Sequence, residues 1–92
     1  MELPSGSIRE VASPSDEELL RLTAAGDRES FAQLIRSHQK HVVQLAARLL
    51  SSPDQAEDVA QDAFIRVYRA AGRFKPQAKF STWLYRIVVN LC

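Results

Sequence analysis

The chain has 92 residues, of which 46% are hydrophobic and 25% are charged, and its formal net charge at pH 7 is +1. A chain of this length builds one small domain with a single core. Its only cysteine is Cys92, which excludes an internal disulfide and suits a reducing cytosol. No apolar run reaches the roughly 18 residues that a membrane span needs, and the first residues lack the pattern of a signal peptide.

The charges are divided unevenly along the chain. Residues 1–62 contain all 11 acidic residues and six basic ones, a net charge of −5. Residues 63–92 contain six basic residues and no acidic one, a net charge of +6. This segregation indicates a polyanionic partner for the C-terminal third, and the alternative is a basic face that is only solvated.

Helical periodicity begins after a polar, aperiodic stretch at residues 1–13, which is predicted to be a disordered tail. A first helix is expected to begin where Ser15 and Glu18 match a capping box. It should end at Gly26, a residue type that is common just after a helix. The residues that this helix should bury are Leu19 and Leu22, with Leu20 as a further candidate.

A helical hairpin is predicted to follow. Its first helix is capped by Asp27 and runs to about Ser51. The predicted buried stripe of this helix is Phe31, Leu34, Ile35, His38, Val42, Leu45, Ala46 and Leu49. The second helix has Ser52 as its cap and Pro53 as its first residue, and extends to Gly72. The predicted buried stripe of the second helix is Ala56, Val59, Ala60, Ala63, Phe64, Val67, Tyr68 and Ala71.

Outside its buried stripe, the second helix of the hairpin carries two ridges of opposite charge. The acidic ridge consists of Glu57, Asp58, Gln61 and Asp62. The basic ridge consists of Arg66, Arg69 and Arg73. A helix with one apolar face and two oppositely charged ends can contact two different partners while it packs on the core.

A last helix is predicted to begin near residues 80–82, after a basic loop. The residues that it should bury are Phe80, Trp83, Leu84, Ile87, Val88 and Leu91. Because this stripe is still in phase when the chain ends at Cys92, without a capping residue, we expect a fragment of a longer protein. Four helices with short connections predict an all-α bundle over residues 14–92.

The sequence contains no catalytic, cofactor-binding or metal-binding motif, which favours a binding protein over an enzyme. His38 and His41 are a weak metal pair, because zinc sites need three or four ligands, and a partly buried imidazole is the better interpretation of His38. Aromatic and basic residues are interleaved over residues 74–86, as in proteins that bind single-stranded nucleic acid. The best candidates for contact with a base are Phe74, Tyr85 and Asn90.

Two segments, AEDVAQDAFIRVYRAAGRF at residues 56–74 and FSTWLYRIVVN at residues 80–90, closely resemble region 2 of bacterial sigma factors of the extracytoplasmic-function group, in the sigma-70 family. The Gly-Asp step at residues 26–27 resembles the start of that region, so the resemblance covers about residues 16–92. It implies docking on the β′ clamp helices of core RNA polymerase. It also implies capture of the non-template strand of the promoter −10 element, with one flipped base in a pocket. A cytoplasmic bacterial location and an anti-sigma factor are implied as well.

The resemblance also assigns roles to residues. The matching polymerase-binding positions are Asp58, Gln61, Asp62 and Ile65. The matching DNA-binding positions are Arg66, Ala70, Phe74, Tyr85, Ile87 and Asn90, with Arg73, Lys75 and Arg86 added for their charge. We expect the acidic ridge to face outward, and Phe74 and Asn90 to share one concave wall with the basic ridge.

Two departures and one alternative accompany this assignment. Residues 75–78 read Lys-Pro-Gln-Ala where relatives commonly have a Gly-Asp-Ser-like turn, and His38 stands where an aromatic residue, often tyrosine, is usual. The alternative function is a helical protein-interaction module whose basic end meets an acidic partner. Binding of single-stranded DNA distinguishes the two.

Overall fold

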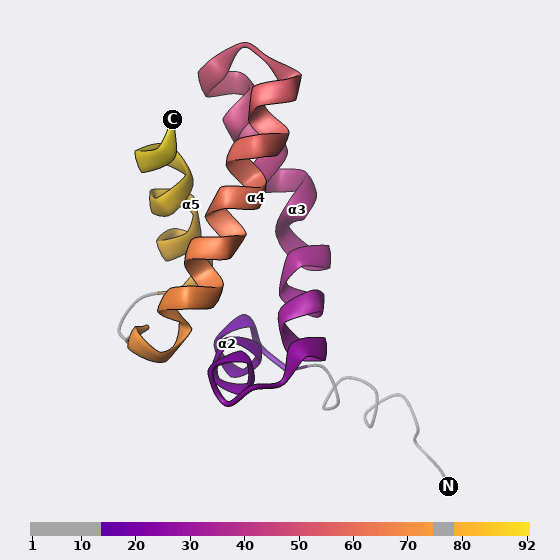
Figure 1. Ribbon diagram of the computed structural model, residues 1–92, viewed down its shortest axis with the longest axis vertical. Helices are drawn as coiled ribbons and strands as arrows, with labels where there is room; N and C mark the ends of the chain where they lie inside the picture. Colours follow the sequence, from indigo (N-terminus) through magenta and orange to yellow (C-terminus); the bar gives the residue numbers. More distant parts are fainter. Residues whose placement is uncertain (1–13, 75–78) are drawn as a thin grey trace, which may run out of the picture.

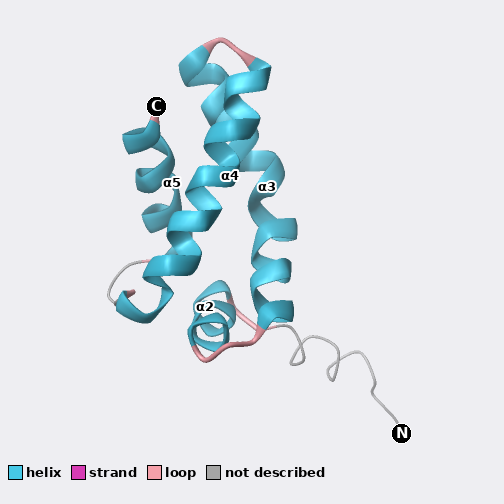
Figure 2. Cartoon of the chain, in the orientation of Figure 1, coloured by secondary structure: helices cyan, strands magenta, loops and turns pink. Residues whose placement is uncertain are grey.

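The computed structural model describes residues 14–74 and 79–92, whose regular structure is helical (Figure 2). The helices are α2 (Asp16–Ala24), α3 (Arg28–Leu50), α4 (Pro53–Ala70) and α5 (Phe80–Leu91), with the 3-10 turn η1 (Ala71–Arg73) after α4. The predicted all-α class is confirmed. The predicted tail at residues 1–13 and the loop at residues 75–78 lie outside the described residues. Among the described helices, none combines the length and the hydrophobicity that a membrane span requires.

The long helices α3 and α4 form an antiparallel hairpin, and α5 packs beside α4 (Figure 1). The short helix α2 lies across the open end of the hairpin, where it contacts α3, η1 and α5. The N-terminus of α5 therefore lies next to α2, and its C-terminus points toward the α3–α4 turn. This arrangement brings the first turn of α2, the end of α4 and the start of α5 together.

The predicted caps hold the starts of α2, α3 and α4. Ser15, Asp27 and Ser52 have extended backbones, and the side chain of each accepts a hydrogen bond from a backbone N–H of the first turn. The capping box at Ser15 is only half formed, because the Glu18 carboxylate pairs with Arg21 instead of reaching back. Three of the four helix starts in the described ranges thus follow from neighbouring residues in the sequence.

The end of α2 is a Schellman motif at Gly26. The Gly26 N–H donates to the carbonyl of Thr23 and the Asp27 N–H donates to that of Leu22, both at 3.0 Å. The φ angle of Gly26 is +105°, a region that favours glycine. At the end of α4, by contrast, the α-helix passes into η1 before Gly72, so α4 is slightly shorter than predicted.

The core lies where the four helices meet and consists mainly of the predicted stripes. Its largest fully buried side chains are Leu20, Leu34, Val42, Val67, Phe80, Leu84 and Val88. Leu49 and Tyr68 were predicted to be buried but are 50% and 49% exposed, and Leu22 is less buried than Leu20. Leu49 lies in the last turn of α3, beyond the part that α5 covers (Figure 1). The ring of Tyr68 lies over Phe31 at the edge of the hairpin, 5.0 Å between centroids.

Phe80, and not Trp83, is the central aromatic residue of α5. The Phe80 ring is fully buried, and its centroid lies 5.3 Å from that of His38. Trp83 is only partly buried and lies over Phe74, 5.0 Å between centroids. His38 is buried, and its Nε2 lies 2.9 Å from Asp16 Oδ2, so it is a hydrogen-bonded core residue. Within the described ranges, no three or more potential metal ligands cluster.

Candidate nucleic-acid and protein interfaces

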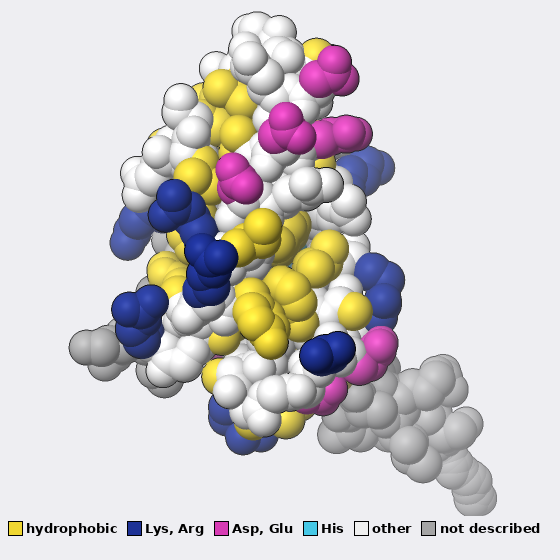
Figure 3. Space-filling model, viewed as in Figure 1, with side chains coloured by type: hydrophobic (Ala, Val, Ile, Leu, Met, Phe, Trp, Pro, Cys, Tyr) yellow, Lys and Arg dark blue, Asp and Glu magenta, His cyan; other side chains and the backbone are white. Residues whose placement is uncertain are grey.

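The acidic ridge of α4 is exposed along its whole length. Figure 3 shows acidic side chains gathered over the part of α4 that is nearest the α3–α4 turn. Because Ala60, Ala63 and Phe64 are buried on the opposite side of the helix, the ridge points outward as predicted. Ile65 is 48% exposed and adds an apolar residue next to the ridge. Within the described part of the chain, no side chain of the ridge forms an ion pair, so its carboxylates are open to a partner.

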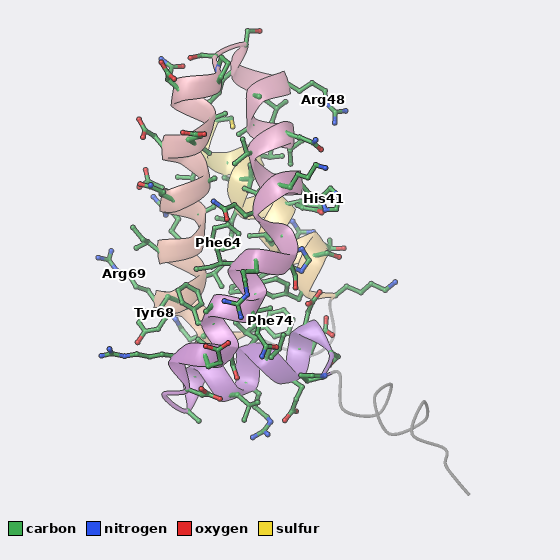
Figure 4. All side chains as sticks on the ribbon, turned by 90° about the vertical axis from the view of Figure 1, so that its right-hand side faces the viewer. His41, Arg48, Phe64, Tyr68, Arg69 and Phe74 are labelled. Carbon is green, nitrogen blue, oxygen red and sulfur yellow. The ribbon has the colours of Figure 1, made fainter. Side chains whose placement is uncertain are left out.

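An apolar groove of about 430 Å³ adjoins the acidic ridge at the junction of α3 and α4. Its main lining residues are Phe31, Ile35, Val43, Gln61, Phe64 and Ile65. Figure 3 shows hydrophobic side chains along this junction, and Figure 4 places Phe64 between the two helices. This groove was not predicted from the sequence. A buried stripe predicts which residues of α3 turn inward, but it does not show that α4 leaves part of the stripe uncovered.

The basic ridge continues along α4 toward its C-terminus. Its three arginines line a shallow hollow of about 450 Å³ together with Asp62, Ile65 and Ala70. Arg66, Arg69 and Arg73 are three and four residues apart, so they share one face of the helix, and all three are exposed. Figure 4 shows Arg69 pointing away from the bundle. Arg69 was not among the predicted DNA-binding positions, although its spacing from Arg66 and Arg73 already indicated it.

A second hollow, of about 130 Å³, joins α4 to α5. It is lined by Arg66, Ile87, Asn90 and Leu91. Arg66 thus lines both hollows and connects the arginine face of α4 with the C-terminal half of α5. Asn90 and Arg86 are exposed, whereas Ile87 and Tyr85 are partly buried against the core.

Phe74 lies at the other end of α5. Its ring packs on Trp83 and on Phe80, and it lines a separate hollow beside α2 (Figure 4). Asn90 is ten residues after Phe80, which is about 15 Å along a helix. The single concave wall predicted from Phe74 to Asn90 is therefore wrong for the described residues, because Phe74 completes the core next to α2. Lys75 lies outside the described residues.

Comparison with known proteins identifies relatives of this arrangement. The family model described as Sigma-70 region 2 matches residues 34–92. The ECF RNA polymerase sigma factor SigM of Mycobacterium tuberculosis is 45% identical over 78 residues, which are 85% of this chain and 40% of that protein. The ECF RNA polymerase sigma factor SigW of Bacillus subtilis is 46% identical over 66 residues, 72% of this chain and 35% of that protein. The chain spans about two fifths of the length of these curated relatives.

A solved structure is similar throughout most of the described chain. It is the NMR structure of an engineered region 2 of sigmaE in complex with GTAAAA. The two structures superpose with a TM-score of 0.77 at 42% identity, covering 85% of this chain and 81% of the other. The predicted resemblance and fold are therefore confirmed. The chain belongs to the Sigma-70 region 2 family, in the group of the extracytoplasmic-function sigma factors.

Proposed function

We propose that this domain acts in transcription initiation as the part of a sigma factor that binds both core RNA polymerase and single-stranded promoter DNA. The acidic half of α4 docks on the polymerase, and the basic half, together with α5, holds the non-template strand of the −10 element. No bond is made or broken. Strand opening is driven by binding, since unstacking a base costs a few kcal/mol that stacking and hydrogen bonds to the protein must offset.

The DNA-binding part of the proposal rests on Arg66, which lines both hollows. Arginines neutralise phosphates, and the amide of Asn90 can both donate to and accept from a base edge. The Phe74 ring packs on Phe80 at the start of α5, and Asn90 lies ten residues further along the helix, about 15 Å, so one nucleobase cannot contact both. The ligand we infer is a strand of several nucleotides, and the complex of the related region 2 of sigmaE with GTAAAA supports this choice.

Fluorescence anisotropy with labelled GTAAAA tests this half. We expect Asn90→Ala to weaken binding by about tenfold, since a good amide–base pair contributes about 1–3 kcal/mol. Arg66→Ala should lower the slope of log affinity against log salt by about 0.7, the value for one contact to a single-stranded phosphate. Gln44→Ala, at an exposed position of α3, is the control. Equal affinity of wild type and both variants would favour the protein-interaction module instead.

The polymerase half of the proposal rests on the acidic ridge and the groove beside it. An apolar groove with a row of carboxylates along one edge suits an amphipathic helix that carries basic residues. Glu57 and Gln61 line the polar edge of the groove, and Ile65 adds an apolar contact next to them. Asp58 and Asp62 lie beside them on the exposed face of α4. We propose that the β′ clamp helices occupy this surface and that an anti-sigma factor competes for it.

Substitutions in the acidic ridge test the polymerase-binding part of the proposal. Asp62→Lys and Gln61→Ala should reduce binding of a β′ clamp-helix fragment while the melting temperature stays unchanged, because both side chains are exposed. Glu29→Lys reverses an exposed charge on α3, away from the ridge, and is the control for binding; it also breaks the ion pair of Glu29 with Arg36. A lower melting temperature for Asp62→Lys, or equal loss of binding for Glu29→Lys, would contradict the proposed surface.

A further inference from the structure

Glu17, in the first turn of α2, is hydrogen-bonded to the first residue of α5. The Phe80 N–H donates to Glu17 Oε2 at 2.7 Å, and the two residues are 63 positions apart in the chain. The N-cap residue of α5 is Lys79, whose side chain makes no capping hydrogen bond. Glu17 therefore supplies, from another helix, the acceptor that a capping residue normally provides.

The same turn of α2 also holds α3. Asp16 Oδ2 lies 2.9 Å from Nε2 of His38, and the His38 ring packs against Phe80 at 5.3 Å between centroids. Asp16 and Glu17 thus connect one turn of α2 to the hairpin and to the start of α5. These two hydrogen bonds act together with the buried Phe80 ring, which packs on His38, to hold the first turn of α5 against α3.

We propose that Glu17 is a positioning residue for DNA binding, an inference that rests on the proposed function. Its carboxylate fixes the first turn of α5, and the helix carries that position to Asn90, which must meet Arg66 across the second hollow. The first N–H groups of a helix have no partners within it, and an anion is favoured there by the helix dipole.

If Glu17 acted only through its charge, its removal would change the affinity for DNA in the opposite direction, so the two explanations can be distinguished. Glu17 is an anion on a domain proposed to bind a polyanion, so loss of its charge would by itself tighten DNA binding. If Glu17 positions α5, Glu17→Ala should bind DNA more weakly. Glu17→Gln should bind almost normally, because its amide oxygen can still accept the hydrogen bond from the Phe80 N–H. Glu17→Asp keeps the charge but is one methylene shorter, so it should also lose the bond. Glu18→Ala removes a neighbouring charge that pairs with Arg21 and is the matched control.

The test combines anisotropy with GTAAAA and amide hydrogen exchange on the same chain. For Glu17→Ala and Glu17→Asp we expect the Phe80 amide to exchange about tenfold faster. We expect GTAAAA to bind these two variants about fivefold more weakly, the effect of a lost cap. Glu17→Gln and Glu18→Ala should stay within about twofold of wild type in both measurements.

Three results would overturn the inference. One is equally tighter binding by Glu17→Ala and Glu17→Gln, which would show a purely electrostatic effect. Another is faster Phe80 exchange with unchanged GTAAAA affinity, and the third is unchanged Phe80 exchange in Glu17→Ala. Failure of the proposed function would be seen separately, as a wild-type chain that does not bind GTAAAA.

Discussion

Replacing Phe80 with alanine should destabilise this domain more than any other aromatic truncation in α5. Phe80 is fully buried, and its ring lies 5.3 Å from His38, 6.0 Å from Trp83 and 6.5 Å from Phe74, between centroids. Truncation of such a core phenylalanine costs about 3–5 kcal/mol. A domain of this length has a total free energy of unfolding of about 5–14 kcal/mol, so this one change should remove a large share of it.

The matched comparison is Trp83→Ala, three residues along the same helix. The sequence stripe alone predicts a core tryptophan, but Trp83 is only partly buried, so we expect a cost of about 1–2 kcal/mol. Urea unfolding followed by circular dichroism measures both variants, and similar m values would show that both unfold as one unit. If Trp83→Ala costs as much as Phe80→Ala, the facing of α5 described above is incorrect.

Three further predictions concern single sites. Gly26→Ala should lower the free energy of unfolding in urea by about 1–2 kcal/mol. The cost comes from the positive φ angle alone, because an added Cβ meets nothing within 4 Å, and an unchanged free energy would refute this. The hydrogen bond from Ser30 lowers the pKa of Asp27 in the folded state. Asp27 therefore stabilises the fold at pH values above its unfolded pKa of about 3.9, and this contribution is lost as the pH falls through the lower folded pKa. Asp27→Asn keeps the cap but does not titrate. The melting temperature of the wild type should therefore exceed that of the variant by less as the pH is lowered, and a constant difference would contradict this prediction. Arg69→Ala should reduce the salt slope of GTAAAA binding by about 0.7, and an unchanged slope would place Arg69 outside the DNA surface.

The local features of this fold could be predicted because their causes are local. Ser52 followed by Pro53 specifies a helix start, and Gly26 followed by Asp27 specifies a stop and a new start, whatever surrounds them. The outward direction of the acidic ridge followed equally directly from helical phase. These features can be predicted without knowing which helices pack against one another.

The features that were missed depend on which helices become neighbours. Tyr68 is in phase with the buried residues of α4, but its ring packs on Phe31 at the edge of the hairpin and stays half exposed. Phe74 follows a helix in a basic segment, and nothing nearby in sequence shows that its ring turns in under α2. The bond from Glu17 to Phe80 joins distant parts of the chain and leaves no periodic pattern.

The two halves of α4 are proposed to bind different partners, and chemical-shift mapping with two ligands can separate them. The isotope-labelled chain is titrated with GTAAAA and, in a separate experiment, with a β′ clamp-helix fragment. We predict that GTAAAA shifts the amides of Arg66, Arg73 and Asn90, and that the polymerase fragment shifts those of Asp58 and Gln61. The same set of shifts with both ligands, or GTAAAA shifts confined to the acidic ridge, would contradict the account.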